Sequence, residues 1–437
     1  MSQYSIETDQ FLNINKTIYE VMMLADPVDG SLNSDYHRAF VDAGYYTPKG
    51  RLQTSQSQIT YFSTNIYGLG LDFWDNYTAN NATIIHTPNA SAITMSVANT
   101  AGSEAIRQTK QVMQYIPGRS AEFTTAFTLT LPVPGVRTRI GAFDESNGFY
   151  FEQLGIPGGG EYSVCLRSKV TGTVVERKVS RENWNGDKLD GTGPSKIIAT
   201  PNTIHLMMVE ADWYGAGDVR FNFVIDGRKH TIHTFRNANI EPNAWSATPF
   251  VPIRFELTNV SSTSAASFIV LSSAFALDGV SISPGVPMST LRYNQTLAIK
   301  DTFYPTISIR CKPDALNSIN ILTRFFGKIH ATNSSWRWKL LVNPELTGAS
   351  WVNHELPYST VQIDISATAV ANGLPVLYGL GEVSGSSIDL ETGPNKSTTF
   401  QIGRSNLGAN TDILTLAVAS NGTNDVFDAV LRWRECR

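Results

Sequence analysis

Two carboxylates, Glu210 and Asp212, stand two residues apart in the stretch VEADWYGAGDVRFNFVIDG (209–227). On a β-strand, residues i and i+2 point to the same face of the sheet. Two acids on one face are the groups that a retaining glycosidase uses as nucleophile and helper acid. The stretch is therefore either a catalytic centre or a piece of scaffold that carries two acids.

The position that would hold the acid/base residue is a glycine. Sugar-cleaving jelly rolls carry the pattern E-x-D-x-x-E on one strand, and its last position is Gly215 here. A retaining mechanism needs two carboxyl groups about 5–5.5 Å apart, so one of them is missing from this strand. GAGDVR (215–220) indicates a turn instead, because glycine tolerates positive φ. We predict no catalytic residue here; an enzyme would need a second carboxylate from another strand close to Glu210.

The remaining motifs predict neither a metal site nor a cofactor. The glycine-rich stretches 155–162 and 215–217 lack the spacing of phosphate-binding loops, and we interpret both as β-turns. His230 and His233 lie three residues apart on a predicted strand, so they point to opposite faces. His205 joins them only if the strands pair suitably. No Cys/His/Asp spacing supports a metal site.

Tryptophans at turns and strand ends have two interpretations, which are packing in the core and contact with a sugar or a protein partner. Packing is the prediction for most of them. Trp245 differs because it lies in the polar loop NIEPNAWSATPF (239–250). We predict that Trp245 is exposed, and it is our candidate for a glycan or partner contact.

The elements that position these residues are predicted to be strands. Val219, Phe221, Phe223 and Ile225 alternate with polar residues before Asp226-Gly227 interrupts the pattern. Asp-Gly between alternating segments is a strong hairpin signal, since a type I′ turn needs positive φ at both central residues. Further strands are predicted at 251–259, 306–311, 336–342, 359–367 and 412–420. Many short strands separated by Gly/Pro/Asn turns predict a mostly β fold of antiparallel β-sandwich or jelly-roll domains.

Changes in the pattern of apolar and polar residues divide the chain into three regions. Residues 1–94 alternate weakly and are predicted to form an irregular N-terminal arm or docking region, with a candidate helix at 15–26. Residues 95–282 are predicted to form a β-sandwich, and residues 283–437 a second β-rich domain. The junction falls in SISPGVPMST (281–290).

Composition excludes some functions. The 437 residues carry a net charge of -4 and contain 16% charged residues, without the basic stripe of a nucleic-acid binder. Cys165, Cys311 and Cys436 are far apart, which predicts free thiols. No apolar run approaches the roughly 18 residues of a membrane span. The first residues do not resemble a signal peptide, so we expect synthesis in the cell interior.

A set of short motifs occurs in a familiar order. The set comprises RQTKQVMQYIPGRSAEF, GAFDESNGFYFEQLG, SVCLRSKVTG, RENWNGDKLDG, ADWYGAGDVRFNFVIDGR, HTFRNAN, VPIRFELTN, KLLVNPELTG, STVQIDISAT, DILTLAVAS and VLRWRECR. Together these motifs resemble a module of virion structural proteins in tailed bacteriophages, especially large phages and cyanophages, and in some giant DNA viruses. The resemblance covers about residues 95–437.

The resemblance implies a non-catalytic virion component of the head surface, neck, tail, baseplate or a fibre. It implies a homo-oligomer, for which we expect a trimer, the commonest arrangement of phage appendages. Residues 1–94 would then contact other virion proteins. Two alternatives stay open: a lectin-like adhesin that binds host-surface glycan, and a glycan-degrading enzyme.

Overall fold

The computed structural model describes residues 12–14, 17–19, 57–71, 73–113, 115–116, 118–212, 214–279, 285–291, 293–315, 319–330, 334–381, 386–389, 401–403, 407 and 411–436. The chain divides into two units, Met1–Gln56 and Ser57–Arg437. In the first unit, β1 (Leu12–Ile14) pairs antiparallel with β2 (Thr17–Tyr19). The helix predicted at 15–26 is therefore wrong at 17–19; its other residues lie outside the described part.

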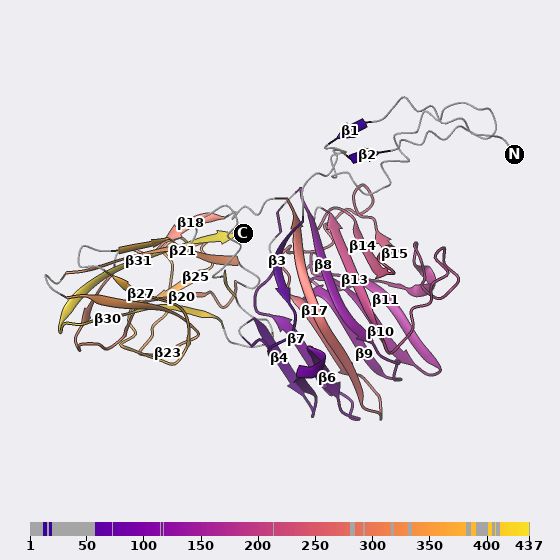
Figure 1. Cartoon of the computed structure of the whole chain (residues 1–437), viewed down its shortest axis with the longest axis horizontal. Coiled ribbons are helices and arrows are strands. Elements are labelled where there is room, and N and C mark those ends of the chain that lie inside the picture. Colours follow the sequence, from indigo (N-terminus) through magenta and orange to yellow (C-terminus); the bar gives the residue numbers. More distant parts are fainter. Residues whose placement is uncertain are drawn as a thin grey trace. The chain divides into compact units, whose positions relative to one another are not determined.

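The second unit begins with a sandwich of two antiparallel sheets (Figure 1). The seven-stranded sheet has the order β12 (Val175–Ser180), β11 (Gly159–Ser168), β10 (Gly148–Ile156), β9 (Val136–Phe143), β16 (Ile253–Asn259), β7 (Glu104–Thr109) and β4 (Trp74–Ala79). The eight-stranded sheet has the order β15 (Arg228–Phe235), β14 (Val219–Ile225), β13 (Thr203–Asp212), β8 (Ser120–Leu129), β17 (Ala266–Asp278), β6 (Ala92–Val97) and β5 (Thr83–Thr87), with β3 (Ser57–Ser63) also paired to β17.

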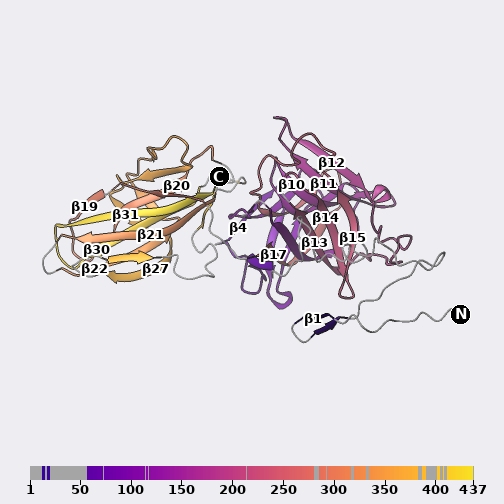
Figure 2. The same ribbon diagram turned by 90° about the horizontal axis from the view of Figure 1, so that it is seen from above.

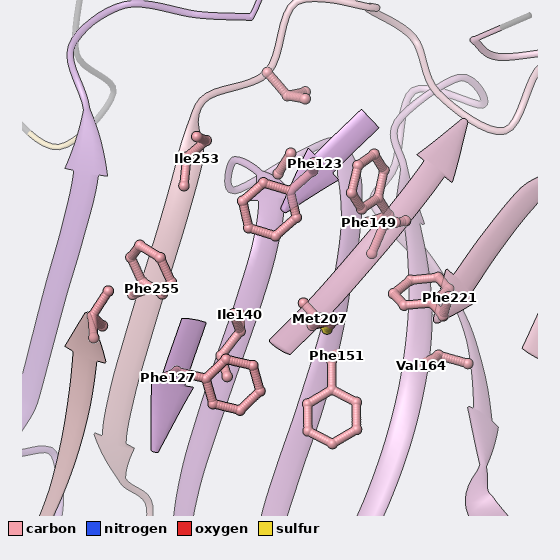
Figure 3. Packing of buried hydrophobic residues seen from close by; sticks show 14 of the residues in the cluster. Phe123, Phe127, Ile140, Phe149, Phe151, Val164, Met207, Phe221, Ile253 and Phe255 are labelled. Carbon is pink, nitrogen blue, oxygen red and sulfur yellow. The ribbon is translucent and has the colours of Figure 1, made fainter. Parts of the chain in front are cut away.

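Alternating strands place an aromatic core between these sheets. On β8 every second residue from Ala121 to Leu129 is buried. Figure 3 shows Phe123 of this strand close to Phe149 of β10, and their ring centroids are 6.4 Å apart. Burial of one phenylalanine side chain stabilises the fold by about 1.5–3 kcal/mol. The inward faces of the two sheets therefore form one hydrophobic core, and the other face of each sheet is free for polar residues.

The predicted hairpin at Asp226-Gly227 is confirmed. β14 and β15 pair antiparallel, with Ile225 opposite Arg228. Asp226 has a φ of 51° and Gly227 a φ of 70°. Both central residues thus adopt the left-handed conformation that a type I′ turn requires.

The later strands form a second sandwich with its own core. One sheet contains β18 (Val286–Ser289), β31 (Asp425–Cys436), β21 (Ile319–Ile329) and β28 (Ser386–Asp389), with β19 (Tyr293–Leu297) beside β31 and β29 (Gln401–Ile402) beside β21. The other has the order β24 (Val352–Asn353), β25 (Val361–Asp364), β20 (Tyr304–Cys311), β30 (Ile413–Ser420), β22 (Trp336–Val342) and β27 (Leu374–Gly381), seen from a second direction in Figure 2. A short pair, β23 (Glu345–Thr347) with β26 (Ala369–Ala371), completes the described strands.

The antiparallel β-sandwich prediction is confirmed, but the structure moves the first boundary. β3, β4 and β5 all lie before residue 95, and each pairs with a strand of the first sandwich. Residues 57–94 are thus part of that sandwich and not of an arm. Their alternation is weak because many of their residues are exposed on both faces, while Trp74 alone of β4 is fully buried.

Helical structure is minor in the described residues. It consists there of two 3-10 turns, η1 (Pro88–Ala90) and η2 (Arg181–Asn183). None of the described helices has the length and apolar character to span a membrane.

Candidate functional site on the eight-stranded sheet

Glu210 and Asp212 share the outer face of β13, as their spacing predicts. Val209 and Ala211, which alternate with them, are completely buried in the core. The two carboxylates are partly exposed on the opposite face, with side-chain exposures of 21% and 18%. The question is then what surrounds them on that face.

Both carboxylates are paired with cations from neighbouring strands. Lys229 Nζ of β15 lies 2.9 Å from Glu210 Oε1 and 3.1 Å from Glu210 Oε2. The Asn222 amide of β14 donates a further hydrogen bond of 3.2 Å to Glu210. Asp212 accepts hydrogen bonds from Arg220 at 2.8 Å and from the Ser120 hydroxyl. These contacts occupy the carboxylate oxygens that a nucleophile would need to present to a substrate.

A third carboxylate, Glu122, lies on β8 directly opposite Glu210. Burial and the negative charges of Glu210 and Asp278 raise the pKa of Glu122, although Lys229 counteracts them. This is a cross-strand acid near Glu210, the feature that an enzyme would need. The sequence alone does not place Glu122 here, because the alternation of a strand does not reveal its register against a distant strand. The site therefore places Glu122, whose pKa is raised, beside Glu210, which forms an ion pair with Lys229.

The position of the missing acid/base residue belongs to a turn. β13 ends at Asp212, and Gly215 has a φ of 90°. An added Cβ there would meet the Ala244 Cβ at 3.5 Å, so backbone conformation rather than space favours glycine. The predicted turn is thus confirmed at Gly215, while Trp213 lies outside the described residues.

A groove runs along the same face beside the acids. It has a volume of about 330 Å³. Thr124 and Ala126 follow Glu122 at two-residue steps along β8, and Ser272 and Ala274 lie across from them on β17. These small side chains are flanked by larger ones from neighbouring strands: Phe62, Leu206, Met208 and Val224. Phe62 is 68% exposed, so an aromatic ring at the groove is accessible to a ligand.

The prediction for Trp245 is wrong, because this side chain is only 4% exposed. Its ring packs against Tyr214 and Phe149, with centroid distances of 4.3 and 6.2 Å. The backbone N–H of Trp245 donates to the Gly215 carbonyl at 2.8 Å. The polar loop thus folds back onto the sandwich at the Gly215 turn, and Trp245 serves as a core residue rather than a glycan or partner contact.

His205, His233 and the three cysteines occupy separate buried positions. His205 Nε2 lies 3.1 Å from both the Thr203 hydroxyl and the Thr200 carbonyl. His233 Nδ1 accepts a hydrogen bond of 3.3 Å from the Asn185 backbone. Cys165, Cys311 and Cys436 are buried and unbridged. Within the described ranges, no group of three His, Cys, Asp or Glu residues is arranged to hold a metal ion.

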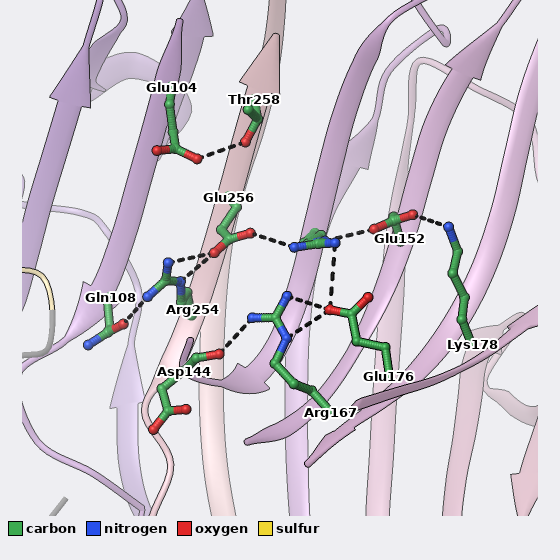
Figure 4. A network of polar contacts seen from close by, with 11 residues as sticks. Glu104, Gln108, Asp144, Glu152, Arg167, Glu176, Lys178, Arg254, Glu256 and Thr258 are labelled. Carbon is green, nitrogen blue, oxygen red and sulfur yellow. Dashed lines mark hydrogen bonds and ion pairs between the residues drawn. The ribbon is translucent and has the colours of Figure 1, made fainter. Parts of the chain in front are cut away.

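The outer face of the seven-stranded sheet carries a buried ion network (Figure 4). Arg139 lies 2.7 Å from Glu152 and 3.6 Å from Glu256, and Arg254 lies 2.6 Å from Glu256. Burial works to raise the pKa of Glu256, but Arg254 and Arg139 hold it below its ordinary value. Since each of these acids is neutralised at close range, we interpret the network as structural.

Comparison with known proteins gives similarity to solved β-sandwich structures. No protein-family model matches the chain, and no curated protein matches it either. A legume lectin-like domain from Entamoeba histolytica has 13% sequence identity and a TM-score of 0.29. The match covers 47% of this chain and 90% of the lectin-like domain. A glycoside hydrolase family protein from Mycobacterium thermorestibile has 11% sequence identity and a TM-score of 0.34. The match covers 50% of this chain and 100% of the hydrolase family protein. A Bacillus licheniformis β-glucanase has 10% sequence identity and a TM-score of 0.30. The match covers 52% of this chain and 99% of the glucanase.

Proposed function

We propose that the chain is a non-catalytic structural component of a bacteriophage virion that assembles as a homo-oligomer. The observation that carries the non-catalytic part is the pairing of Glu210 and Asp212 with Lys229 and Arg220. Carboxylates bound to cations in this way tie three adjacent strands together across the sheet. The acid/base position of the glycosidase pattern lies in a turn at Gly215.

The virion assignment is supported by the ordered set of motifs over residues 95–437. Two consecutive antiparallel sandwiches are consistent with an outward-facing body. The preceding unit, Met1–Gln56, is the segment that we propose to attach this body to other virion proteins. Assembly would take place in the host cytoplasm, with the finished particle as the final location.

A mass-spectrometric inventory of purified particles tests this proposal. The chain should be present at a stoichiometry that matches a symmetric site on the particle, and a trimer predicts a multiple of three. A chain that is expressed during infection but washes away from purified particles would contradict the proposal.

The groove on the eight-stranded sheet favours a second candidate function, binding of a host-surface glycan. Ligand sites are commonly apolar with a few well-placed polar groups. The groove fits this description, because the hydroxyl groups of Thr124 and Ser272 line it. Glu122 lies two residues before Thr124 on β8, and Glu210 lies opposite Glu122 on β13. The exposed ring of Phe62 could stack on the apolar face of a sugar.

Binding of the full chain to an array of host-surface polysaccharides tests this candidate. Phe62→Ala should lower retention of the bound polysaccharide. Tyr378→Ala is the matched control, since Tyr378 is an exposed aromatic residue on the second sandwich, with 58% exposure. Equal loss in both variants, or no retention by the unmodified chain, would refute glycan binding in this groove.

A further inference from the structure

One loop of the first sandwich exposes four large apolar side chains. Residues 64–73 connect β3 of the eight-stranded sheet to β4 of the seven-stranded sheet. The exposed side chains are those of Ile66 (45%), Tyr67 (97%), Leu71 (57%) and Phe73 (52%). A single exposed apolar residue is ordinary on a protein surface, but four within one short loop form a local concentration. We call these four side chains the loop patch.

The first half of the loop is fixed to the sandwich by Arg107 of β7, which is completely buried. Its guanidinium group donates hydrogen bonds of 2.8 Å to the Leu69 carbonyl and 3.3 Å to Asn65 Oδ1. The Asn65 side-chain amide donates in turn to the Leu271 carbonyl of β17 at 3.0 Å. His86 Nε2 of β5 lies 2.9 Å from the Asn65 carbonyl oxygen. Strands of both sheets therefore hold this half of the loop.

A tight turn fixes the second half of the loop. Gly70 has a φ of 59°, in the left-handed region that glycine adopts most readily. The backbone N–H groups of Phe73 and Trp74 both donate to the Gly70 carbonyl, at 3.0 and 2.9 Å. Trp74 is buried in the core, whereas the Phe73 side chain beside it is exposed. The fold thus holds the loop patch in place, which lowers the entropy that its burial in an interface would cost.

The loop patch has the chemistry of a permanent protein interface. Its four side chains carry one polar atom, the Tyr67 hydroxyl oxygen, and the sequence of the loop contains one charged residue, Asp72. Interfaces between permanently associated copies of a chain are among the most hydrophobic, and charged residues are depleted at their centre. A site for a polar ligand such as a sugar would instead need several well-placed polar groups.

The exposed area of the loop patch is large enough for the centre of such an interface. An aromatic side chain buries roughly 150–250 Å², so at their observed exposures Tyr67 and Phe73 offer about 220–370 Å² together. Ile66 and Leu71 add on the order of 100 Å². A stable interface buries about 800 Å² on each partner, of which roughly 65% is apolar when the partners are identical. The loop patch alone would therefore supply more than half of the apolar area that a second copy needs.

We propose that the loop patch is buried against a second copy of this chain, with Tyr67 as its central contact. This inference rests on the homo-oligomer of the proposed function, and it names a surface through which that oligomer forms. Tyrosine suits the central position because it offers a large contact area with few rotatable bonds. Aromatic residues at the centre of an interface also contribute most of its binding energy.

Sedimentation velocity of the purified full chain over a range of concentrations tests the inference. The unmodified chain should self-associate. Tyr67→Ser should raise the dissociation constant of the oligomer by about tenfold or more, the usual effect of truncating a central interface aromatic. Tyr378→Ser is the matched control, because Tyr378 is also exposed but lies on the second sandwich. This control should change the dissociation constant by less than about twofold.

Two further variants separate a surface effect from a loss of folding. Phe73→Ser should weaken self-association independently of Tyr67. Tyr67→Phe keeps the ring and should associate as the unmodified chain does. Since Tyr67 is almost fully exposed, Tyr67→Ser should leave thermal unfolding of the subunit unchanged.

The outcomes distinguish this inference from the proposed function. Equal self-association of Tyr67→Ser, Phe73→Ser and Tyr378→Ser would overturn the role of the loop patch but not the homo-oligomer. A chain that stays monomeric at every concentration would overturn both. Loss of Tyr67→Ser from purified particles would in that case identify another virion protein as the occupant of the patch.

Discussion

Glu122 and Glu210 lie directly opposite each other on β8 and β13, and Glu210 has a lysine partner at 2.9 Å. The two side chains therefore lie in different electrostatic environments although they share one face of the sheet. Burial, together with the charge of Glu210, raises the pKa of Glu122. This asymmetry gives measurable consequences that do not depend on knowing the ligand.

Glu122→Gln should make the protein more stable at neutral pH. Because the folded-state pKa of Glu122 is raised above 4.5, its contribution is fully present below that pH. The contribution is lost as pH rises through the folded-state pKa, since the unfolded chain gives up the proton more readily. Glutamine mimics the protonated acid and removes this loss. Urea unfolding of both proteins between pH 4 and pH 8 measures the difference, and parallel pH profiles would contradict the assignment.

Glu210→Gln should leave particle assembly intact. It should not change polysaccharide turnover, because we expect no turnover by the unmodified chain. The pair with Lys229 is partly exposed, with Lys229 at 45%, so its loss should cost at most about 1 kcal/mol. The same substitution should lower the pKa of Glu122, whereas Lys229→Gln should raise it. Turnover by the unmodified chain that disappears in Glu210→Gln would show that the acids are catalytic.

His233→Asn should reduce the sensitivity of the fold to acid. Burial and the nearby charge of Arg177 lower the pKa of His233 from 6.5 to about 4. A depressed histidine pKa gives stability that is present above pH 6.5 and is lost as pH falls through about 4. Asparagine can replace Nδ1 as the acceptor of the Asn185 backbone N–H but does not titrate. Unfolding measured from pH 7 to pH 4 should be flatter for the variant; a His233 resonance that titrates near 6.5 would contradict this account.

Gly227→Val should destabilise the hairpin by on the order of 1–2 kcal/mol, because a β-branched residue resists positive φ. An added Cβ at Gly227 meets nothing within 4 Å, so the cost arises from the backbone alone. Gly227→Asn is the matched control, since asparagine tolerates the left-handed conformation. Equal denaturation midpoints for the two variants would argue against the type I′ turn.

Local rules were sufficient to predict this hairpin and the shared face of Glu210 and Asp212. Both depend on residues close together in sequence, where alternation and turn chemistry act directly. Glu122 could not be placed in the same way, because its register against β13 joins residues 88 positions apart (210 − 122). Trp245 was mispredicted because its neighbours are polar, whereas the fold of the loop onto Tyr214 decides its burial.

The N-terminal boundary shows the same limit. β3 pairs with β17, whose residues lie more than 200 positions later in the chain. Trp74 packs under Arg107, with 4.2 Å between the Arg107 Cζ and the ring centroid. These contacts are long-range, so the weak pattern of residues 57–94 did not reveal them. An N-terminal truncation must therefore stop before Ser57.

Deletion of residues 1–56 should leave a folded body that fails to enter virions. Deletion of residues 1–80 removes β3 and β4, including the buried Trp74, and should destroy the first sandwich. Thermal unfolding distinguishes the two truncations. Normal occupancy of the 1–56 deletion on particles would show that the attachment surface lies on the sandwiches.

Cryo-electron microscopy of purified virions tests the central claim most directly. The account predicts density for both β-sandwiches of each subunit at a symmetric position on the head surface, neck, tail, baseplate or a fibre. Virions that contain no such density, from cells in which the chain is abundantly expressed, would contradict a structural role in the particle.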